Sequence, residues 1–363
     1  MMQVNDLVNA MEQIAPTRFA ETWDNVGLLA GDPNREIRRI FLTIDYTQEV
    51  AAEGRQWGCQ AVVAYHPPIF QPLKRLSAGG VVFDAIERGV AIYSPHTALD
   101  VADGGTNDLL ADVLGLEGRL PLRPMEAKAG HCKLVTFVPR EQVGPVSEAM
   151  FSAGAGRIGN YTHCSFQSDG VGTFWGQEGA NPTVGSAGQL ERVDEVRLEA
   201  VVPVDGIRPV IEALRRSHPY EEPAFDLVQL AAVPADRGQG RIGTIKPMTR
   251  RQIIERIKHE LGLSQVLVAG PVEGTITRAA ACAGSCGDLL QDALRQKAEL
   301  YLTGEMRHHD ALAAAQAGMT VICTLHSNSE RAVLRRVQRR LQEMLAGVEV
   351  ECAQSDRDPF SAV

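Results

Sequence analysis

The sequence predicts an α/β protein in which two related α/β halves form one domain, interrupted by a smaller inserted α+β domain. Three observations carry this prediction. Short apolar stretches alternate with short helical patterns in residues 39–114 and again in residues 278–345, as in βαβ units with a mostly parallel sheet. Both segments contain an apolar run that ends in a histidine with a carboxylate four residues later. Residues 132–230 between them follow a different order of elements.

The first half opens with a helix over residues 3–15, where apolar residues recur at helical spacing until Pro16. Residues 20–32 mix turn residues with apolar ones and are expected to form a loop that faces either solvent or a substrate. Two prolines after His66 must stop the strand that leads to it. The remaining expected elements are strand 39–45, helix 47–57, strand 60–66, helix 80–88, strand 90–96 and helix 106–114, with Thr106 or Asn107 as N-cap.

The middle segment reads as strand, helix, two strands, helix and strand, an order compatible with a ferredoxin-like layer. The expected elements are strand 132–138, helix 142–153, strands 161–166 and 172–175, strand 196–202, helix 207–217 and strand 225–230. Prolines at 121 and 124 and the stretch 234–238 bracket this segment. The predicted boundaries are therefore 1–126 for the first half, 127–234 for the insert and 235–363 for the second half.

The second half repeats the order of the first. The expected elements are strand 278–288, helix 289–297, strand 298–305, helix 310–317, a strand ending at His326 and helix 330–345. Because ligands of parallel sheets bind beyond the carboxyl ends of the strands, the side chains at these ends are the candidates for function. Two related halves would aim them at one cleft.

Composition limits the class of protein. The chain has 363 residues, enough for two ordinary domains, and a formal net charge of −9, which disfavours nucleic acid and acidic membrane surfaces as partners. Seven cysteines, an odd number with no Cys-x-x-Cys pair, favour reduced thiols in a cytoplasmic protein. The first residues lack the pattern of a signal peptide, and no apolar run approaches the ~18 residues of a membrane span.

The repeated motif His-x-x-x-carboxylate points to a metal site. It pairs His96 with Asp100 and His326 with Glu330, and residues four apart share one face of a helix. Mixed imidazole and carboxylate ligands suit Zn, Fe, Mn or Ni, and Glu330 could bridge two ions in a hydrolytic arrangement. A single strand-end histidine is more often structural, but several such ends converge here. The proposed group consists of His66, His96, Asp100, Glu305, His326 and Glu330.

Several of these motifs together resemble the Nif-three-like family, whose members carry the name GTP cyclohydrolase I type-two homologue. They are residues 23–28 (Trp-Asp-Asn-Val-Gly-Leu), 65–70 (Tyr-His-Pro-Pro-Ile-Phe), 93–100 (Tyr-Ser-Pro-His-Thr-Ala-Leu-Asp), 304–309 (Gly-Glu-Met-Arg-His-His) and 326–331 (His-Ser-Asn-Ser-Glu-Arg). The resemblance covers both α/β halves. Residues 159–166 and 218–225 are similar to the PII- or CutA-like domain of longer members.

The resemblance implies a toroidal homohexamer with two divalent metal ions per subunit. By motif position, His66, Asp100, His326 and Glu330 match family metal ligands, with Glu330 as the bridging one. Many members have His-His-Pro where this chain has Tyr65-His66-Pro67, so a second ion requires another ligand. The additional candidate ligands are Tyr65, His96, His308 and His309. His96 would otherwise orient a ligand or water.

Two functions follow as expectations. The first is a metal-dependent hydrolase acting on a nucleotide-like substrate, with Glu305 or His96 moving protons. No guanine-reading motif is found in the sequence. The alternative is a metal-binding regulatory or scaffold protein without turnover, since the insert resembles signalling and trimer-forming modules.

Overall fold

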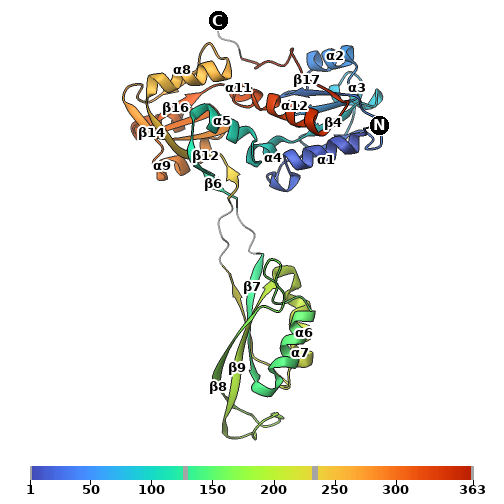
Figure 1. Ribbon diagram of the computed structural model, residues 1–363, viewed down its shortest axis with the longest axis vertical. Coiled ribbons are helices and arrows are strands. Elements are labelled where there is room, and N and C mark those ends of the chain that lie inside the picture. Colours follow the sequence, from blue (N-terminus) through green and yellow to red (C-terminus); the bar gives the residue numbers. More distant parts are fainter. Residues whose placement is uncertain (1, 126–129, 231–235, 361–363) are drawn as a thin grey trace. The chain divides into compact units, whose positions relative to one another are not determined.

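The computed structural model describes residues 2–125, 130–230 and 236–360. By internal contacts the chain divides into two compact units, one of residues 1–125 with 236–363 and one of residues 126–235. Figure 1 colours both along the sequence. Each unit is described by itself.

The larger unit contains a five-stranded sheet in the order β1-β4-β3-β2-β17. Its strands are β1 (Gly27–Ala30), β2 (Arg39–Thr43), β3 (Ala61–Ala64), β4 (Ala91–Ser94) and β17 (Glu349–Cys352). Only β1 runs antiparallel to its neighbour. Every residue of β3 and β4 is buried, which explains why these strands read as unbroken apolar runs. The C-terminal part of the chain returns to this sheet, because β17 pairs with β2. The sequence pattern did not predict β17.

A six-stranded sheet in the same unit has the order β13-β16-β15-β14-β12-β5. Its strands are β5 (Glu117–Leu120), β12 (Arg241–Thr249), β13 (Leu267–Ala269), β14 (Thr275–Ser285), β15 (Leu300–Glu305) and β16 (Thr320–Cys323). The central strands β14, β15 and β16 are parallel, and β13 is antiparallel to β16. β6 (Arg123–Pro124) and β11 (Gly238–Gln239) form a separate two-stranded ladder. Each large sheet therefore contains consecutive parallel strands, four in the first sheet and three in the second, that are flanked by an antiparallel strand.

Short helices connect and cover these sheets. They are α1 (Val4–Ile14), α2 (Gln48–Trp57), α3 (Val81–Glu87), α4 (His96–Val101), α5 (Thr106–Leu114), α8 (Arg250–Leu261), α9 (Leu290–Arg295), α10 (His308–Gln316), α11 (His326–Arg331) and α12 (Val333–Met344). Figure 1 shows α5, α11 and α12 in the middle of this unit, where α5 and α11 pack on β14 and α12 packs on β17. The predicted helix over 330–345 is in fact two helices that meet at Ala332.

One hydrophobic core joins the two large sheets. It includes Leu42 of β2, Leu110 of α5, Leu302 of β15 and Val337 of α12, all essentially inaccessible to water. Burying each such side chain contributes roughly 1.5–3 kcal/mol. The shared core holds the carboxyl ends of β3 and β16, which belong to different sheets, in a fixed relation.

The smaller unit has one antiparallel sheet with two helices on one face. Its elements are β7 (His131–Pro139), α6 (Val143–Ser152), β8 (Ser165–Trp175), β9 (Leu190–Pro203), α7 (Ile207–Ser217) and β10 (Phe225–Gln229), with sheet order β10-β7-β9-β8. Val146 and Leu214 of the helices pack against Leu134 and Leu198 of the strands. In place of the two short strands predicted at 161–166 and 172–175, the structure has one strand, β8, which begins at Ser165 and pairs with β9 along its whole length.

The described residues also contain four 3₁₀ turns: Thr17–Phe19, Arg140–Gln142, Val204–Gly206 and Gly287–Leu289. Across the residues that the structure describes, every helix is too short or too polar to cross a membrane.

Candidate metal centre

His66 lies just beyond the carboxyl end of β3, where Pro67 ends the strand. Its ring is held on both sides. Nδ1 lies 2.9 Å from Oδ1 of Asp45, which follows the neighbouring strand β2, and Nε2 lies 3.2 Å from Oε2 of Glu330. The Asp45 contact fixes the ring so that Nε2 points toward Glu330.

His326 and Glu330 both lie on α11, which starts directly after β16. The turn between β16 and α11 is tight, because Leu325 has a φ of 73°, a left-handed conformation that few non-glycine residues adopt. The i, i+4 spacing places Nε2 of His326 3.3 Å from Oε1 of Glu330. Nδ1 of His326 lies 2.9 Å from Oε1 of Glu305, at the end of β15. The two histidines are therefore oriented in the same way.

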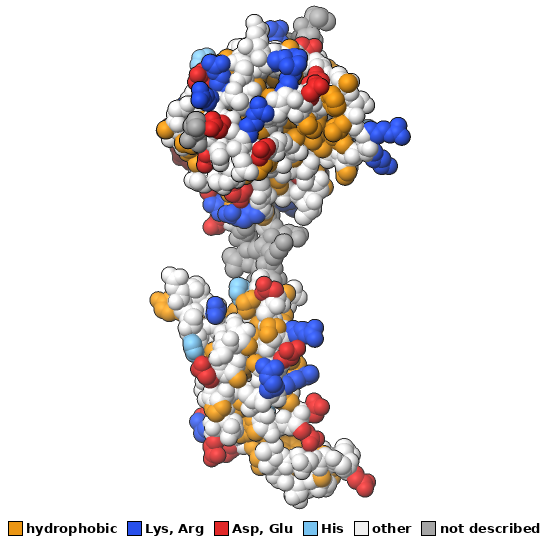
Figure 2. Space-filling view, turned by 90° about the vertical axis from the view of Figure 1, so that its right-hand side faces the viewer, with side chains coloured by type: hydrophobic (Ala, Val, Ile, Leu, Met, Phe, Trp, Pro, Cys, Tyr) orange, Lys and Arg blue, Asp and Glu red, His pale blue; other side chains and the backbone are white. Residues whose placement is uncertain are grey.

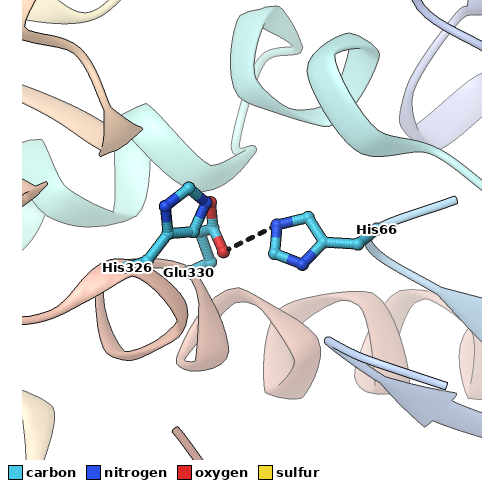
Figure 3. Close-up of side chains that lie close together, drawn as sticks. All are labelled: His66, His326 and Glu330. Carbon is cyan, nitrogen blue, oxygen red and sulfur yellow. Dashed lines mark ion pairs between the residues drawn. The ribbon is translucent and has the colours of Figure 1, made fainter. Parts of the chain in front are cut away.

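These side chains form a compact group of potential metal ligands. One ligand atom each from His66, His326 and Glu330 can be chosen so that all lie within 4.8 Å of one another. Figure 3 shows His66 approaching from the end of a strand while His326 and Glu330 come from one helix. Glu330 is only 3% exposed, and its Oε2 accepts no hydrogen bond of good geometry.

This arrangement fits a divalent cation. A metal-bound histidine usually gives its outer nitrogen to a carboxylate, which fixes the tautomer and orients the ring. Asp45 and Glu305 occupy that outer position for His66 and His326. A buried carboxylate oxygen without a hydrogen-bond donor is costly, and a cation between the two inner nitrogens would satisfy it.

Protonation of the metal-free group follows from its charges. Burial lowers the pKa of His66, but its hydrogen bond to Asp45 and its close approach to the Glu330 carboxylate outweigh burial and raise the pKa to about 10. The hydrogen bond to Glu330 raises the pKa of His326 to about 9. Burial acts to raise the pKa of Glu330, yet both histidines hold it below its usual 4.5. Protons on the imidazoles therefore balance the carboxylate charge until a metal displaces them.

Asp100, a predicted ligand, lies outside this close group. Its Oδ1 accepts a hydrogen bond from the hydroxyl of the fully buried Tyr65, which is also 3.1 Å from Oγ1 of Thr106. Burial, together with the charge of Glu330, raises the pKa of Asp100 to about 6 against the opposing effect of the Tyr65 hydrogen bond. The structure thus assembles three of the four residues that match family ligands and ties the fourth to Tyr65.

Thr106 and Asn107 have structural roles that the sequence did not suggest. The N-cap of α5 is Gly105, not Thr106 or Asn107. Both side chains turn inward instead, and Asn107 donates to the backbone oxygen of Asp100 and accepts from the amide of Ala283 on β14. Asn107 therefore ties the Asp100 turn to the second large sheet.

His96 lies beside the group. Its ring centroid is 5.5 Å from that of His66, and its Nδ1 lies 2.7 Å from Oδ1 of Asp24. Asp24 also accepts a hydrogen bond from the backbone amide of Thr97. The φ of His96 is 28°, an unusual value for a non-glycine residue, and such conformations are enriched at functional sites. Asp24 belongs to the loop whose role the sequence left open.

The remaining predicted residues lie farther out. Glu305 contacts the group through His326 alone, and its side chain is 49% exposed. His308 and His309 are exposed at the first turn of α10, with ring centroids 5.3 Å apart, and neither belongs to the close group. Asp45 and Asp24 were not assigned to the site from the sequence. The position of Asp45 at a strand end was the available signal.

Gly284, near the end of β14, touches the ligand group. It has a φ of 70°, and a Cβ there would lie 2.9 Å from Oε1 of Glu330 and 3.4 Å from Nε2 of His326. Its amide donates a hydrogen bond of 2.8 Å to Oγ of Ser329, between the two ligands on α11. Only glycine therefore fits at this contact.

Fold and site together define an α/β protein with a partly buried His-His-Glu group suited to a divalent cation. The model of the family Duf34/NIF3 (NGG1p interacting factor 3) matches residues 2–359. The chain belongs to this family, as the motifs of the sequence predicted.

Relatives match over most of the chain. A protein of Bacillus subtilis (strain 168) named GTP cyclohydrolase 1 type 2 homolog is 36% identical over 364 residues, which covers 98% of this chain and 97% of the relative. A protein of the same name from Mycobacterium tuberculosis (strain ATCC 25618 / H37Rv) is 36% identical over 317 residues, with 85% and 83% covered.

Solved structures support the same assignment. A Bacillus cereus protein related to NIF3 superposes with a TM-score of 0.66 at 35% identity, covering 100% of this chain and 99% of the other. Staphylococcus aureus protein SA1388 superposes with a TM-score of 0.77 at 28% identity, with the same coverage. The mixed α/β fold is thus that of NIF3-related structures.

Proposed function

We propose that this protein is a divalent-metal-dependent hydrolase of the GTP cyclohydrolase I type-two homologue kind, acting on a nucleotide-like substrate. One observation carries the proposal. Two histidines turn their inner nitrogens toward one buried carboxylate, while Asp45 and Glu305 hold their outer nitrogens. The names of the relatives agree with this reading.

The proposed centre holds two ions of unequal affinity. His66, His326 and Glu330 are the ligands of the tighter ion. A second ion would draw on Asp100 and Glu330, whose charges already influence each other. Because Asp100 accepts a hydrogen bond from Tyr65, binding there must first break that bond. The second ion is therefore the weaker one.

Each of the site residues has a defined task in this proposal. A divalent cation supplies Lewis acidity and a water of lowered pKa when bound. Asp45 and Glu305 keep His66 and His326 in the tautomer with a free Nε2. Glu305 is half exposed and can exchange a proton with solvent. Asp24 holds His96 beside the group, where its ring can accept or donate a proton.

The architecture proposed for the whole chain follows the sequence analysis. Residues 1–126 and 235–363 are interpreted as repeated halves, because each contributes a run of three parallel strands (β2, β3, β4 and β14, β15, β16) that is flanked by an antiparallel strand (β1 and β13). Residues 127–234 are read as an inserted ferredoxin-like, PII- or CutA-like domain, supported by the element order of the smaller unit. The proposed assembly is a cytoplasmic homohexamer, with neither nucleic acid nor membrane as partner.

Turnover tests the proposal. Protein loaded with Mn²⁺ or Zn²⁺ should hydrolyse GTP or another nucleoside triphosphate, and Glu330→Gln should abolish this because the buried ligand of the group is lost. Glu343→Gln, which changes an exposed glutamate on α12, is the matched control and should keep full activity. Metal-loaded protein that turns over no nucleoside triphosphate would contradict the hydrolase assignment.

The alternative function is a metal-binding regulatory or scaffold protein without turnover. A specific observation favours it. The smaller unit contains a cavity of about 560 Å³, bordered by Phe137, Phe174, Glu195 and Tyr220. Figure 2 shows hydrophobic side chains at the surface of this unit, which is the lower body in that view, and Phe166, Trp175 and Leu190 are more than half exposed. Partner binding that depends on added Mn²⁺, in protein without hydrolase activity, would support this function over the first.

A further inference from the structure

Two cysteines close to the proposed metal ligands have their sulfur atoms near each other. Cys282 is near the end of β14, and Cys286 follows four residues later. Their Sγ atoms are 2.7 Å apart, and neither thiol is bonded to another sulfur. Cys282 is buried and Cys286 is half-buried. The fold therefore already holds the two sulfur atoms close to the S–S bond length of a disulfide, which is about 2.05 Å.

The surrounding chain holds the two thiols together. The pairing of β14 with β15 shifts register between Cys282 and Ser285, so the segment leaves the regular ladder and turns back on itself. The hydroxyl of Tyr301 donates a hydrogen bond of 2.9 Å to the backbone oxygen of Cys286, and the thiol of Cys286 donates to the backbone oxygen of Ala283. The proximity is thus a property of a hydrogen-bonded turn.

The same turn packs against the proposed metal ligands of α11. Gly284 is the middle residue between the two cysteines, and there is no room for a Cβ between it and Glu330. Its amide is bonded to Ser329, and its carbonyl accepts from Oγ1 of Thr303 at 3.3 Å. A change in the shape of the turn must therefore be passed on to α11.

We propose that Cys282 and Cys286 are a redox pair that a hydroperoxide closes to a disulfide, and that closure weakens metal binding at His66, His326 and Glu330. The coupling to metal rests on the function proposed above, whereas disulfide formation does not. Closure brings the two sulfurs more than half an ångström closer. Because Gly284 already touches Glu330, this contraction displaces the carboxylate from the histidines.

The chemistry balances with one hydroperoxide for each disulfide. The thiol of Cys286 attacks the peroxide oxygen, which gives a sulfenic acid and releases water (or an alcohol) from the other half of the peroxide. The sulfur of Cys282 then attacks the sulfenyl sulfur, and its proton leaves with the hydroxyl as a second water. A dithiol reductant reverses the reaction by exchange.

The order of the two steps follows from exposure and charge. Cys286 is the half-buried thiol, so peroxide reaches it first. The hydrogen bond between the thiols and the burial of Cys282 raise the pKa of Cys282 well above 9, which keeps it as a thiol and unsuited to the first attack. Cys282 is therefore the residue that resolves the sulfenic acid.

Thiol counting on the full chain tests the disulfide. Treatment of metal-free protein with hydrogen peroxide should reduce the free thiols measured in denaturant from seven, the number in the sequence, to five. The monomer mass should fall by about 2 Da, and dithiothreitol should reverse both changes. Cys282→Ser and Cys286→Ser should each abolish the effect, while Cys164→Ser, at a half-buried thiol of the smaller unit, should keep it. Seven remaining thiols, a sulfinic acid at Cys286 or a disulfide between chains would overturn the pair.

Metal affinity tests the coupling separately. Mn²⁺ is the probe, because thiols are poor ligands for it. The oxidised wild type should bind Mn²⁺ at least tenfold more weakly than the reduced protein, and Cys282→Ser should show no change after peroxide. Equal affinity of oxidised and reduced protein would overturn the coupling even if the disulfide forms. Absence of Mn²⁺ binding in both states would instead contradict the proposed metal centre.

Discussion

The hydroxyl of Tyr65 donates a hydrogen bond to Oδ1 of Asp100 in the interior of the larger unit. The family resemblance implies a histidine ligand at the position where this chain has Tyr65. Tyr65 thus stands in the place of one potential metal ligand, and its hydroxyl is hydrogen-bonded to a second potential ligand, Asp100. In the proposed dinuclear centre, occupancy of the second metal position therefore depends on this hydrogen bond.

Replacing Tyr65 should strengthen the second metal site. In Tyr65→His an imidazole takes the place of the hydroxyl and Asp100 is released, so the second equivalent of Mn²⁺ should bind at least tenfold more tightly than in the wild type. Calorimetric titration measures both equivalents. Tyr93→Phe is the matched control, since Tyr93 is equally buried and its hydroxyl has no hydrogen-bond partner. An unchanged second equivalent would show that Tyr65 does not limit the site.

Metal binding should release protons. His66 and His326 have pKa values raised to about 10 and about 9 in the metal-free protein, so both are charged at pH 7.5, while a metal requires neutral imidazoles. Binding of the first ion at pH 7.5 should therefore release about two protons, and the affinity should rise with pH until about pH 10. Calorimetry in two buffers of different ionisation enthalpy measures the number. Release of no protons would mean that these imidazoles are not the ligands.

The pKa of Asp100 predicts a pH-dependent effect on stability. A pKa raised from 3.8 to about 6 means that the folded metal-free protein binds this proton more tightly than the unfolded chain. The associated stability is present below pH 3.8 and is lost as the pH rises through 6. Asp100→Asn removes the charge, so it should be more stable than the wild type by about 3 kcal/mol at pH 8 and by only about 0.5 kcal/mol at pH 4. Urea unfolding of both metal-free proteins at the two pH values checks this. A gain that is equal at both pH values would contradict it.

We expect Gly284 to be required for metal binding because of its contact with Glu330, and not only because of its backbone conformation. Gly284→Ala introduces a Cβ 2.9 Å from Oε1 of Glu330, whereas Gly318→Ala, at a similar positive φ of 77°, meets no atom within 4 Å. Both variants should lose about 1 kcal/mol of stability. Only Gly284→Ala should bind Mn²⁺ at least tenfold more weakly. Similar metal affinity in the two variants would show that the contact with Glu330 is unimportant.

The carboxylates behind the histidines should control affinity without being ligands. Asp45→Asn and Glu305→Gln keep the size of the side chain but remove the charge next to Nδ1. Each should weaken metal binding by roughly 10–100-fold without changing the number of ions bound. Equilibrium dialysis gives both quantities. Loss of a whole equivalent in either variant would make that residue a ligand instead.

The sequence predicted much of the fold because the central strands are buried on both faces. Unbroken apolar runs such as residues 61–64 and 91–94 leave little ambiguity. Strands at the sheet edges were missed: exposed Glu349 and Glu351 break the apolar pattern of β17, and β13 is only three residues long. The division of residues 326–344 into α11 and α12 was also missed, since Ala332 between them keeps helical backbone angles and no glycine or proline marks the break.

The candidate site was predictable to the extent that it follows strand ends. His66, His326 and Glu330 could be named from their positions in the motifs, and the structure brings them together. The bond between Tyr65 and Asp100 could not, because hydrogen bonding between buried side chains depends on the packing of β3 against α4 and α5. The same holds for Asp24, which reaches His96 from a loop 72 residues earlier in the chain.

Metal content tests the central claim most directly. Wild-type protein and His66→Ala, His326→Ala and Glu330→Gln variants, purified without added metal and then dialysed against Mn²⁺, should be compared by elemental analysis. The wild type should retain at least one ion per chain, and each variant should lose the tight ion while keeping the folded circular dichroism spectrum. Equal metal content in folded wild type and folded variants would contradict a metal centre at these three residues.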